Sequence, residues 1–146
     1  MLSEKQKIEI KLTAILLVGK VYKYGAEVNP ETKPEDIVGI DCSELIEYCF
    51  GRAGIKIPDG AINQFNASEP IEREKLETGD LAFKRSKETK IINHSALVID
   101  GKEIIEAEGF FRKIIQRPIE KFMTVSEKAK SEFAGFRRFR IDEKIA

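Results

Sequence analysis

The stretch of residues 41–50, Asp-Cys-Ser-Glu-Leu-Ile-Glu-Tyr-Cys-Phe, limits what this chain can fold into more than any other part of its sequence. Asp41 is a good N-cap residue, because its carboxylate can accept hydrogen bonds from the free amides of a first helical turn. Gly54 is a natural stop. Apolar residues recur before it at helical spacing: Leu45, Ile46, Cys49, Phe50 and Ala53. We therefore predict a short amphipathic helix, with Cys42 at or just after its start, that packs one face against another layer.

Cys42 occupies a position where a helix can make a cysteine reactive. The unpaired amides of the first turn and the positive end of the helix dipole favour the thiolate over the thiol. A free cysteine is more often a small buried apolar residue, so position alone leaves both roles open. The one histidine of the chain, His94, opens an apolar run that is typical of a buried strand. A lone histidine is more often structural than catalytic, but a cysteine at a helix start and a histidine at a strand start form the pattern of a cysteine–histidine pair.

Seven short motifs follow one another in the order and approximate spacing of a known family. They are residues 22–25 (Tyr-Lys-Tyr-Gly), 41–43 (Asp-Cys-Ser), 54–58 (Gly-Ile-Lys-Ile-Pro), Gln64, 78–83 (Thr-Gly-Asp-Leu-Ala-Phe), 94–99 (His-Ser-Ala-Leu-Val-Ile) and 105–107 (Ile-Glu-Ala). Each motif is weak alone, but together they extend over nearly the whole chain. On these motifs the chain resembles the NlpC-type (NlpC/p60) cell-wall cysteine peptidases, a papain-like superfamily of endopeptidases and amidases.

The predicted helices precede the predicted strands, which indicates a single α+β domain over residues 1–146 with an antiparallel sheet. The resemblance implies the papain-like form of this fold, in which the nucleophile helix packs on the sheet that carries the base. It also implies a cysteine peptidase or amidase that needs no cofactor. Its expected substrate is the peptidoglycan stem peptide, typically at the D-glutamyl–diamino acid bond.

The catalytic assignments follow from the cysteine–histidine pattern. His94 takes or shares the thiol proton, the Cys42 thiolate attacks a peptide carbonyl, and water resolves the thioacyl-enzyme. The backbone amide of Cys42 would hold the oxyanion at the helix start. The resemblance implies a tyrosine beside the nucleophile, which we assign to Tyr24. Asp41 and Ser43, which flank the cysteine, complete the expected substrate and oxyanion-binding residues.

We predict Glu106 as the third member of the site, orienting the far nitrogen of His94. The resemblance places a polar residue here, often a second histidine. If residues 99–101 form a bulged three-residue loop, Val98 opposes Lys102 and His94 directly opposes Glu106, on one face of the sheet. A two-residue loop would instead turn Glu106 to the other face. Glu108 is the alternative third member. The other possibility is that Glu106 is a solvated glutamate with no part in the site.

The remaining elements are predicted from apolar periodicity and from glycine and proline positions. The expected helices are residues 3–23, ended by Gly25 and packed deep because it is apolar on most sides, then 61–66 and a weak one at 125–131. An acidic loop without regular structure is expected at residues 26–39, and a turn or short helix at 118–123. Strands are expected at residues 81–84, 94–99, 102–108, 110–117 and 133–140.

The composition excludes several function classes. The formal net charge is zero, which gives no case for a nucleic-acid partner. Basic residues gather after residue 109. They could form a solvated face of the sheet or a weak binding surface for an anionic polymer, and the sequence leaves both interpretations open. One histidine and two cysteines do not make a zinc set of ordinary spacing, so we expect no metal. Cys42 and Cys49 would lie roughly 10 Å apart along one helix, too far for a disulfide.

No apolar run is long enough to cross a bilayer, so we expect no membrane partner. No signal peptide is visible either. We therefore expect that the chain is made in the cytoplasm and reaches a cell wall through lysis, a phage particle or a secretion route. The oligomeric state stays open.

Two other functions share these features. One is a non-catalytic cell-wall-binding or phage-structural module that keeps the fold, although the intact pair of Cys42 and His94 argues against it. The other is a cysteine–histidine acyltransferase or deamidase that acts on protein. One departure from the family is Glu44, where a glycine is usual; its bulk and negative charge oppose a lowered Cys42 pKa, and we expect it to alter substrate choice more than catalysis.

Overall fold

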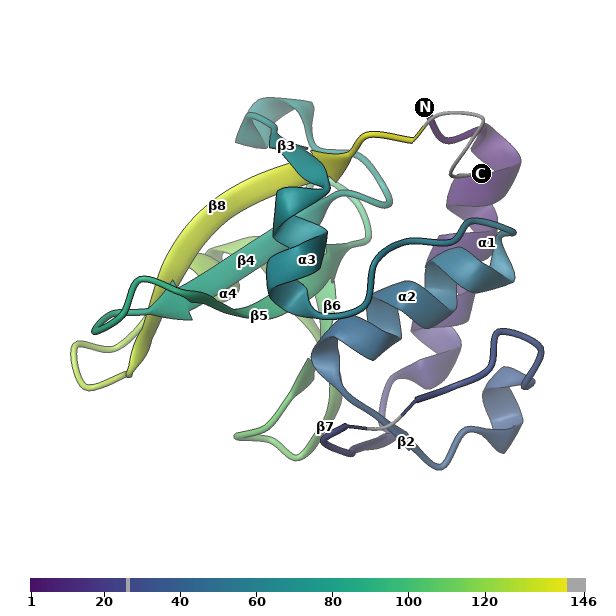
Figure 1. The fold of residues 1–146 in the computed structure, drawn as a ribbon, viewed down its shortest axis with the longest axis horizontal. Coiled ribbons are helices and arrows are strands. Elements are labelled where there is room, and N and C mark those ends of the chain that lie inside the picture. The colour runs from purple at the N-terminus through teal and green to yellow at the C-terminus, as the bar shows by residue number, and fades with distance from the viewer. Residues whose placement is uncertain (26, 142–146) are drawn as a thin grey trace.

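A computed structural model of the chain describes residues 1–25 and 27–141. Two helices, α1 and α2, lie side by side at one side of the molecule, and a curved sheet forms the other side (Figure 1). Met1 and Ile141, the first and last described residues, lie side by side, with the Met1 amine donating to the Ile141 carbonyl at 3.2 Å. The helices are α1 (Glu4–Leu17), α2 (Cys42–Arg52), α3 (Ala61–Asn66) and α4 (Ile119–Met123), with 3-10 turns η1 (Pro34–Asp36) and η2 (Arg73–Lys75).

One sheet with the strand order β2-β1-β7-β6-β5-β4-β8-β3 joins the rest of the chain. The pair β1 and β2 is parallel and the other pairs are antiparallel. The strands are β1 (Val21–Tyr22), β2 (Gly39–Ile40), β3 (Ser68–Pro70), β4 (Leu81–Ser86), β5 (Ile92–Val98), β6 (Glu103–Glu108), β7 (Lys113–Pro118) and β8 (Ser131–Phe139). The predicted α+β class with an antiparallel sheet is therefore confirmed.

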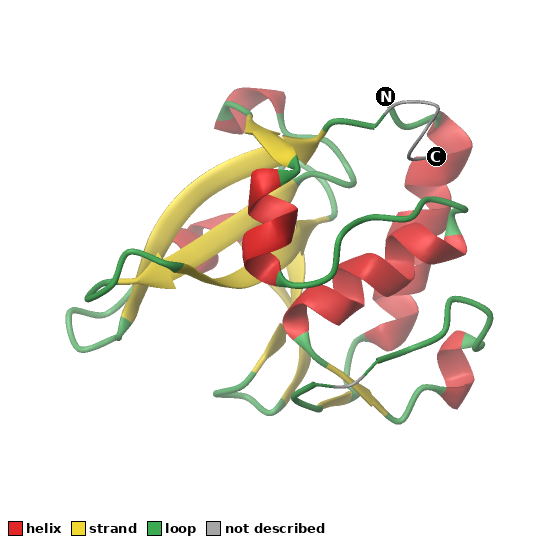
Figure 2. Cartoon of the chain, viewed as in Figure 1, coloured by secondary structure: helices red, strands yellow, loops and turns green. Residues whose placement is uncertain are grey.

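The sheet carries apolar residues on both faces. The helices α2 and α3 cover one face, and α4 lies on the other (Figure 2). Successive residues of a strand point to opposite faces, so Leu97 joins the core below α2 while Val98 joins the smaller core below α4. Seven of the first nine residues of α2 are buried, which makes this helix the centre of the larger core.

The first helix is shorter than predicted. A capping box of Ser3 and Gln6 starts α1 at Glu4, but the helix ends at Leu17. Gly19 then takes the left-handed conformation at φ +93° and turns the chain into β1. The prediction of a helix over residues 3–23 was wrong because we placed the stop at Gly25 and not at this earlier glycine.

The orientation of α1 also differs from the expectation of a deeply packed helix. The buried stripe is Ile10, Thr13, Ala14 and Leu17, which follows the helical period. The other apolar stripe faces outward, with Ile8 57% exposed and Leu16 64% exposed. A helix has several possible apolar stripes in such a sequence, and only the one that meets α2 is buried.

The hairpin between β5 and β6 has a three-residue loop, but not the predicted one. Leu97 pairs with Ile105 and Val98 with Ile104, and the amide of Ile99 donates to the carbonyl of Glu103 at 2.9 Å. The loop is therefore residues 100–102, one residue later than predicted. Asp100 Oδ1 fixes it by accepting from the amides of Lys102 (2.8 Å) and Glu103 (2.9 Å).

This register shift corrects the predicted pairing of His94 with Glu106. The observed pairing is displaced by two positions from the predicted one, which is an even number, so the faces do not change. Val98 directly opposes Ile104, and His94 and Glu106 each lie an even number of residues away from that pair. Both side chains therefore still share one face of the sheet.

The acidic segment between β1 and α2 is more ordered than predicted. It contains the turn η1 and the strand β2, and it buries Pro34 and Ile37. Its backbone accepts from two side chains of α2: the Tyr48 hydroxyl donates to Thr32, and Arg52 Nη1 donates to Pro30 at 3.1 Å. Residue 26 lies outside the described residues. The segment is thus a packed cover of α2 rather than a solvated loop.

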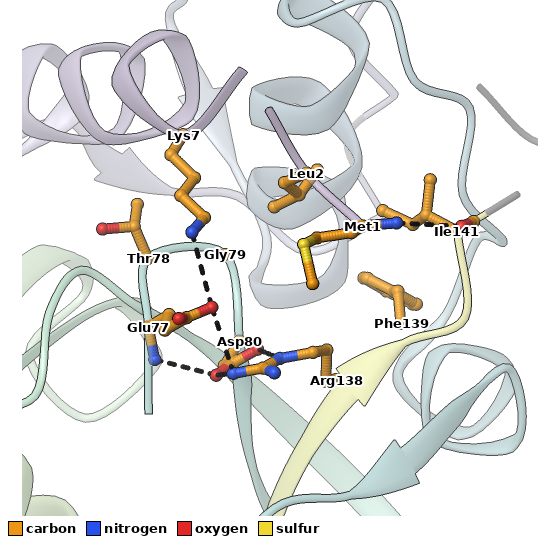
Figure 3. A pocket seen from close by; sticks show the side chains of 10 residues that line it. All are labelled: Met1, Leu2, Lys7, Glu77, Thr78, Gly79, Asp80, Arg138, Phe139 and Ile141. Atoms are coloured by element: carbon orange, nitrogen blue, oxygen red, sulfur yellow. Dashed lines mark hydrogen bonds and ion pairs between the residues drawn. The ribbon is translucent and has the colours of Figure 1, made fainter. Parts of the chain in front are cut away.

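The end of the sheet near Met1 and Ile141 is held by an ion pair between a buried carboxylate and a half-buried arginine. Asp80 is 2% exposed, and both its oxygens accept from Arg138, at 2.7 Å from Nε and 2.9 Å from Nη2. Asp80 also accepts from the backbone amide of Glu77, and the carboxylate of Glu77 in turn accepts from Lys7 Nζ (Figure 3). These groups, with Leu2 and Phe139, line an enclosed pocket. Asp80 is therefore structural, as predicted, although its main partner is an arginine of β8 rather than a local turn.

The other predicted elements are largely confirmed. The helix at 61–66 and the short helix at 118–123 correspond to α3 and α4, and the closing strand corresponds to β8. The weak helix at 125–131 was wrong, because this segment forms a turn. No helix in the described part of the chain is both long and apolar enough to cross a membrane.

Candidate active site

Cys42 is the first residue of α2, directly after the strand β2. Asp41 caps this helix: its Oδ1 accepts from the amide of Glu44 at 2.9 Å, and its carbonyl accepts from the amide of Leu45 at 3.0 Å. An α-helix leaves its first amides without intrahelical acceptors. The cap takes the amide of Glu44, so those of Cys42 and Ser43 remain available to an oxyanion formed at the Cys42 thiol.

His94 and Glu106 lie together behind the nucleophile. His94 Nε2 is 2.7 Å from Glu106 Oε1, and the side chains are 17% and 0% exposed. Since Nε2 faces Glu106, Nδ1 is the ring nitrogen left for the Cys42 thiol. Arg117 Nε donates to the second oxygen of Glu106 at 2.6 Å. The imidazole also stacks on Phe122 of α4, with ring centroids 6.0 Å apart.

The position of the thiol against the sheet follows from the short β5–β6 ladder. Within the described residues, these two strands pair only at Leu97–Ile105 and Val98–Ile104. The first half of β5 is therefore not bonded to β6, and the amide of Ser95 is free to donate to the Cys42 sulfur. The nucleophile thus meets the sheet where two neighbouring strands separate.

The electrostatics of the site favour an ion pair between thiol and imidazole. Burial raises the pKa of Cys42, but the hydrogen bond and charge of His94 and the Ser95 amide outweigh burial and lower the pKa below its ordinary value. Burial lowers the pKa of His94, but its contacts with Cys42 and Glu106 raise it to about 9. Both shifts favour the thiolate and imidazolium over the neutral thiol and imidazole.

Asp41 and Ser43 lie beside Cys42 but are used within the protein. Asp41 Oδ2 accepts from the amide of Gly25 at 3.2 Å, and the Ser43 hydroxyl donates to Asp41 Oδ1 at 3.4 Å. Ser43 is 8% exposed. The structure therefore shows these side chains as parts of the helix cap, and their contact with substrate stays a prediction.

Tyr24 does not lie in the site, which corrects the sequence-based assignment. Its side chain is 89% exposed in the turn after β1. Tyr22, two residues earlier, packs against the core of α2, and burial together with the charge of Cys42 raises the pKa of its hydroxyl. Tyr22 is thus the tyrosine beside the nucleophile. The error follows from the predicted helix over residues 3–23, which concealed the strand that turns Tyr22 inward.

Gln64 connects the two halves of the site, a role that sequence reasoning missed. The side chain is fully buried in α3. Its Nε2 donates to the carbonyls of Ser43 (3.0 Å) and Pro58 (3.1 Å), and its Oε1 accepts from the Ser95 hydroxyl at 3.2 Å. Gln64 therefore joins the neighbour of the nucleophile to the neighbour of the histidine. Its place in a motif was the signal that could have found it.

Three carboxylates gather beside the start of α2. Oxygens of Glu44, Glu47 and Asp59 lie within 4.8 Å of one another. Glu44 accepts from the amide of Val28 at 3.1 Å, so its carboxylate is directed to the segment before η1. Burial and the charges of Glu44 and Asp59 raise the pKa of Glu47 to about 7. Acidic groups of this kind are common without a bound ion, and proximity alone does not make them a metal site.

Comparisons with known proteins give one family model and several relatives. The sequence model of the NlpC/P60 family matches residues 19–129, which is more than half of the chain. The chain is 34% identical over 87 residues to the bifunctional muramidase/DL-endopeptidase CwlT of Bacillus subtilis, covering 59% of this chain and 24% of that protein. It is 31% identical over 93 residues to the gamma-DL-glutamyl hydrolase of the same organism, covering 62% and 21%. The chain thus matches less than a quarter of the length of either relative.

Among solved structures, the fold is similar to that of a Staphylococcus aureus protein described as similar to a lipoprotein of the NLP/P60 family. The TM-score is 0.74 at 23% identity, and the match covers 97% of this chain and 43% of that one. At this identity the likeness supports the fold alone.

Proposed function

The chain belongs to the NlpC/P60 family, and from this premise we propose that it is a cysteine peptidase that hydrolyses amide bonds of peptidoglycan stem peptides, of the D-glutamyl–diamino acid type. The observation that carries the proposal is the array at the start of α2. A thiol with a lowered pKa faces a histidine, whose Nε2 lies 2.7 Å from a fully buried glutamate. This arrangement supplies a nucleophile, a general acid and base, and a group that orients it.

In the first half of the reaction the Cys42 thiolate attacks the carbonyl carbon and forms a C–S bond. The carbonyl oxygen becomes negatively charged and accepts from the amides of Cys42 and Ser43 at the helix start. His94 gives its Nδ1 proton to the leaving amine nitrogen, and the C–N bond breaks. Glu106 holds the ring through Nε2, so the imidazolium and the neutral imidazole keep one orientation.

In the second half water resolves the thioacyl-enzyme. Neutral His94 takes a proton from water, the oxygen attacks the thioacyl carbon, and the C–S bond breaks. The thiolate and the imidazolium are restored, and the product acid loses its remaining proton to solvent. His94 gives the proton to the leaving amine and takes the proton from the attacking water, so one residue serves both halves of the reaction.

The substrate class rests on the named relatives and on the family. A DL-endopeptidase and a gamma-DL-glutamyl hydrolase are two of the proteins to which this chain is similar. Both names point to a bond between a D- and an L-centre, as in the stem peptide. The acidic carboxylates of Glu44, Glu47 and Asp59 near the nucleophile are a feature of this chain, and they favour substrates with a cationic group over acidic ones.

The test uses purified cell walls incubated with wild type, Cys42→Ala and Cys49→Ala. Cys49 is the other thiol and lies fully buried, two helical turns further along α2, so its variant is the matched control. Mass spectrometry of the released fragments identifies the bond. We expect wild type and Cys49→Ala to release stem-peptide fragments with a new amine on the diamino acid, and Cys42→Ala to release none.

The outcomes separate the alternatives. Binding of wild type to walls without any new amine would contradict the peptidase and favour a binding module. Cleavage of another stem-peptide bond would keep the peptidase and overturn the D-glutamyl assignment. Cleavage by Cys42→Ala at the wild-type rate would remove the thiol from the mechanism.

A further inference from the structure

Arg117 donates a hydrogen bond to Glu106, and this bond has no role in the reaction as described above. Glu106 is 0% exposed, and a buried carboxylate is costly unless it is paired and hydrogen-bonded. Its Oε1 faces His94, and its Oε2 accepts from Arg117 Nε at 2.6 Å. Both oxygens are therefore committed, and the carboxylate cannot turn without losing a partner.

We infer that Arg117 is a positioning residue of the reaction, which acts through Glu106 by keeping this carboxylate ionised and fixed while His94 gains and loses its proton. The inference rests on the proposed function, in which His94 changes charge twice in each turnover. When His94 is neutral, the charge of Glu106 would be buried without a hydrogen-bonded cation if Arg117 were absent, because Lys84 is near enough only for charge attraction. With Arg117 in place, Glu106 has a cationic partner in every state.

The sheet places Arg117 for this task. β7 pairs with β6 so that Arg117 directly opposes Ile104, two residues before Glu106. Residues two apart in a strand share a face, so the arginine reaches Glu106 diagonally across the ladder. The guanidinium also lies over Phe122, with Cζ 5.8 Å from the ring centroid. Phe122 thus supports both His94 and Arg117.

Other charged groups face this site, and none takes the place of Arg117. Lys84 of β4 directly opposes His94, but its Nζ lies over the ring of Phe122 at 4.5 Å. The described residues show no hydrogen bond from Lys84 to Glu106. The remaining ionisable groups around the pair are Cys42 of α2 and Glu108 of β6. Apart from His94 itself, Arg117 is thus the only cation in the described residues that bonds the carboxylate directly.

The experiment measures the site without substrate first. The rate of iodoacetamide alkylation of Cys42 against pH reports the thiolate, whatever the enzyme cleaves. For Arg117→Met, we expect Glu106 to hold a proton or turn away, so that His94 loses its counter-charge. Compared with wild type, the Cys42 thiolate then forms at higher pH and His94 loses its proton at lower pH. The pH range in which the thiolate–imidazolium pair exists becomes narrower. With a cleavable stem peptide, kcat/KM should fall about 10- to 100-fold, less than the 10²–10⁴ of a general base.

Arg138→Met is the matched control. Arg138 pairs with another buried carboxylate, Asp80, through an Nε contact of 2.7 Å, but away from His94. It should lower the urea midpoint without moving the alkylation profile. Arg117→Lys keeps the charge and the fold if Arg117→Met does not fold, and it should give an intermediate profile.

A double substitution tests whether Arg117 acts through Glu106. In a Glu106→Gln background the carboxylate charge is gone, so adding Arg117→Met should change the alkylation profile and kcat/KM little further. An alkylation window in Arg117→Met that is unchanged or wider than in wild type would overturn the inference, as would full additivity of the two substitutions. Since alkylation needs no substrate, this failure is distinct from a failure to cleave cell walls.

Discussion

Replacing Gln64 by Met should separate the two halves of the active site. The unbranched apolar side chain keeps the length of glutamine but removes three buried hydrogen bonds, to Ser43, Pro58 and Ser95. A net hydrogen bond contributes about 0.5–1.5 kcal/mol, and a buried group left without a partner costs about 1–3 kcal/mol. We therefore expect the free energy of unfolding to fall by roughly 2–4 kcal/mol, which leaves most domains of this size folded.

The effect on catalysis should exceed the effect on stability at temperatures where the variant is folded. Gln64 fixes the residue after Cys42 to the residue after His94, so its loss allows the thiol and the imidazole to move apart. A displacement of about 1 Å can cost about 10²-fold in rate. Urea denaturation gives the free energy of unfolding. The activity is kcat/KM on a stem peptide, measured about 20 °C below the melting midpoint, where the variant is still folded.

The control is Asn63→Leu, which removes the neighbouring amide of the same helix. Asn63 makes one exposed hydrogen bond, to the carbonyl of Asp59 at 2.9 Å, and surface changes are usually within about 0.5 kcal/mol. If Gln64→Met lowers the free energy of unfolding by no more than this control, the buried cross-link is not stabilising. If stability falls and kcat/KM does not, the cross-link does not position the pair.

Four further predictions concern ionisation. The kcat/KM profile should fall on the alkaline side near pH 9, where His94 loses its proton; an alkaline limb near pH 7 would contradict the ion pair. Because the folded pKa of His94 lies above 6.5, its stabilising contribution is complete below about pH 6.5 and is lost as pH rises through about 9, which melting curves from pH 6 to 10 can follow. Glu47→Gln should stabilise the protein at pH 8 by about 1 kcal/mol after solvent screening, and little at pH 4, because the raised pKa makes the charged form unfavourable above about 7; equal effects at both pH values would refute this. Limited iodoacetamide treatment should modify Cys42 and spare Cys49, because burial strongly raises the pKa of the Cys49 thiol. If peptide mapping finds Cys49 labelled first, Cys42 is not the reactive thiol.

The nucleophile helix could be predicted closely because its signals are local. Asp41 caps α2, and the apolar residues that follow are buried. The same holds for α3 and for the face shared by His94 and Glu106, which depends only on whether the register shift is even or odd. These features need no knowledge of distant contacts.

The errors arise where distant contacts decide. Nothing local distinguishes Gly19 from Gly25 as the end of α1; the pairing of Val21 with Gly39 and Lys113 makes the earlier choice. That strand then decides that Tyr22 faces Cys42 and Tyr24 faces solvent. Arg117 could not be found either, because it reaches Glu106 through a register between β6 and β7 that sequence alone does not fix.

The strand order has a consequence for when the Cys42 thiol becomes reactive during folding. α2 is complete at Arg52, but β5 and β6, which carry His94 and Glu106, follow much later in the chain, and β1 finds its partner only in β7. Contacts between such distant segments form slowly. A nascent or refolding chain therefore carries a thiol with an ordinary pKa of about 8.5, and full nucleophilicity arrives only when the sheet closes. The thiol therefore stays weakly reactive until the fold is complete. The appearance of a fast-reacting thiol would report that a molecule has finished folding.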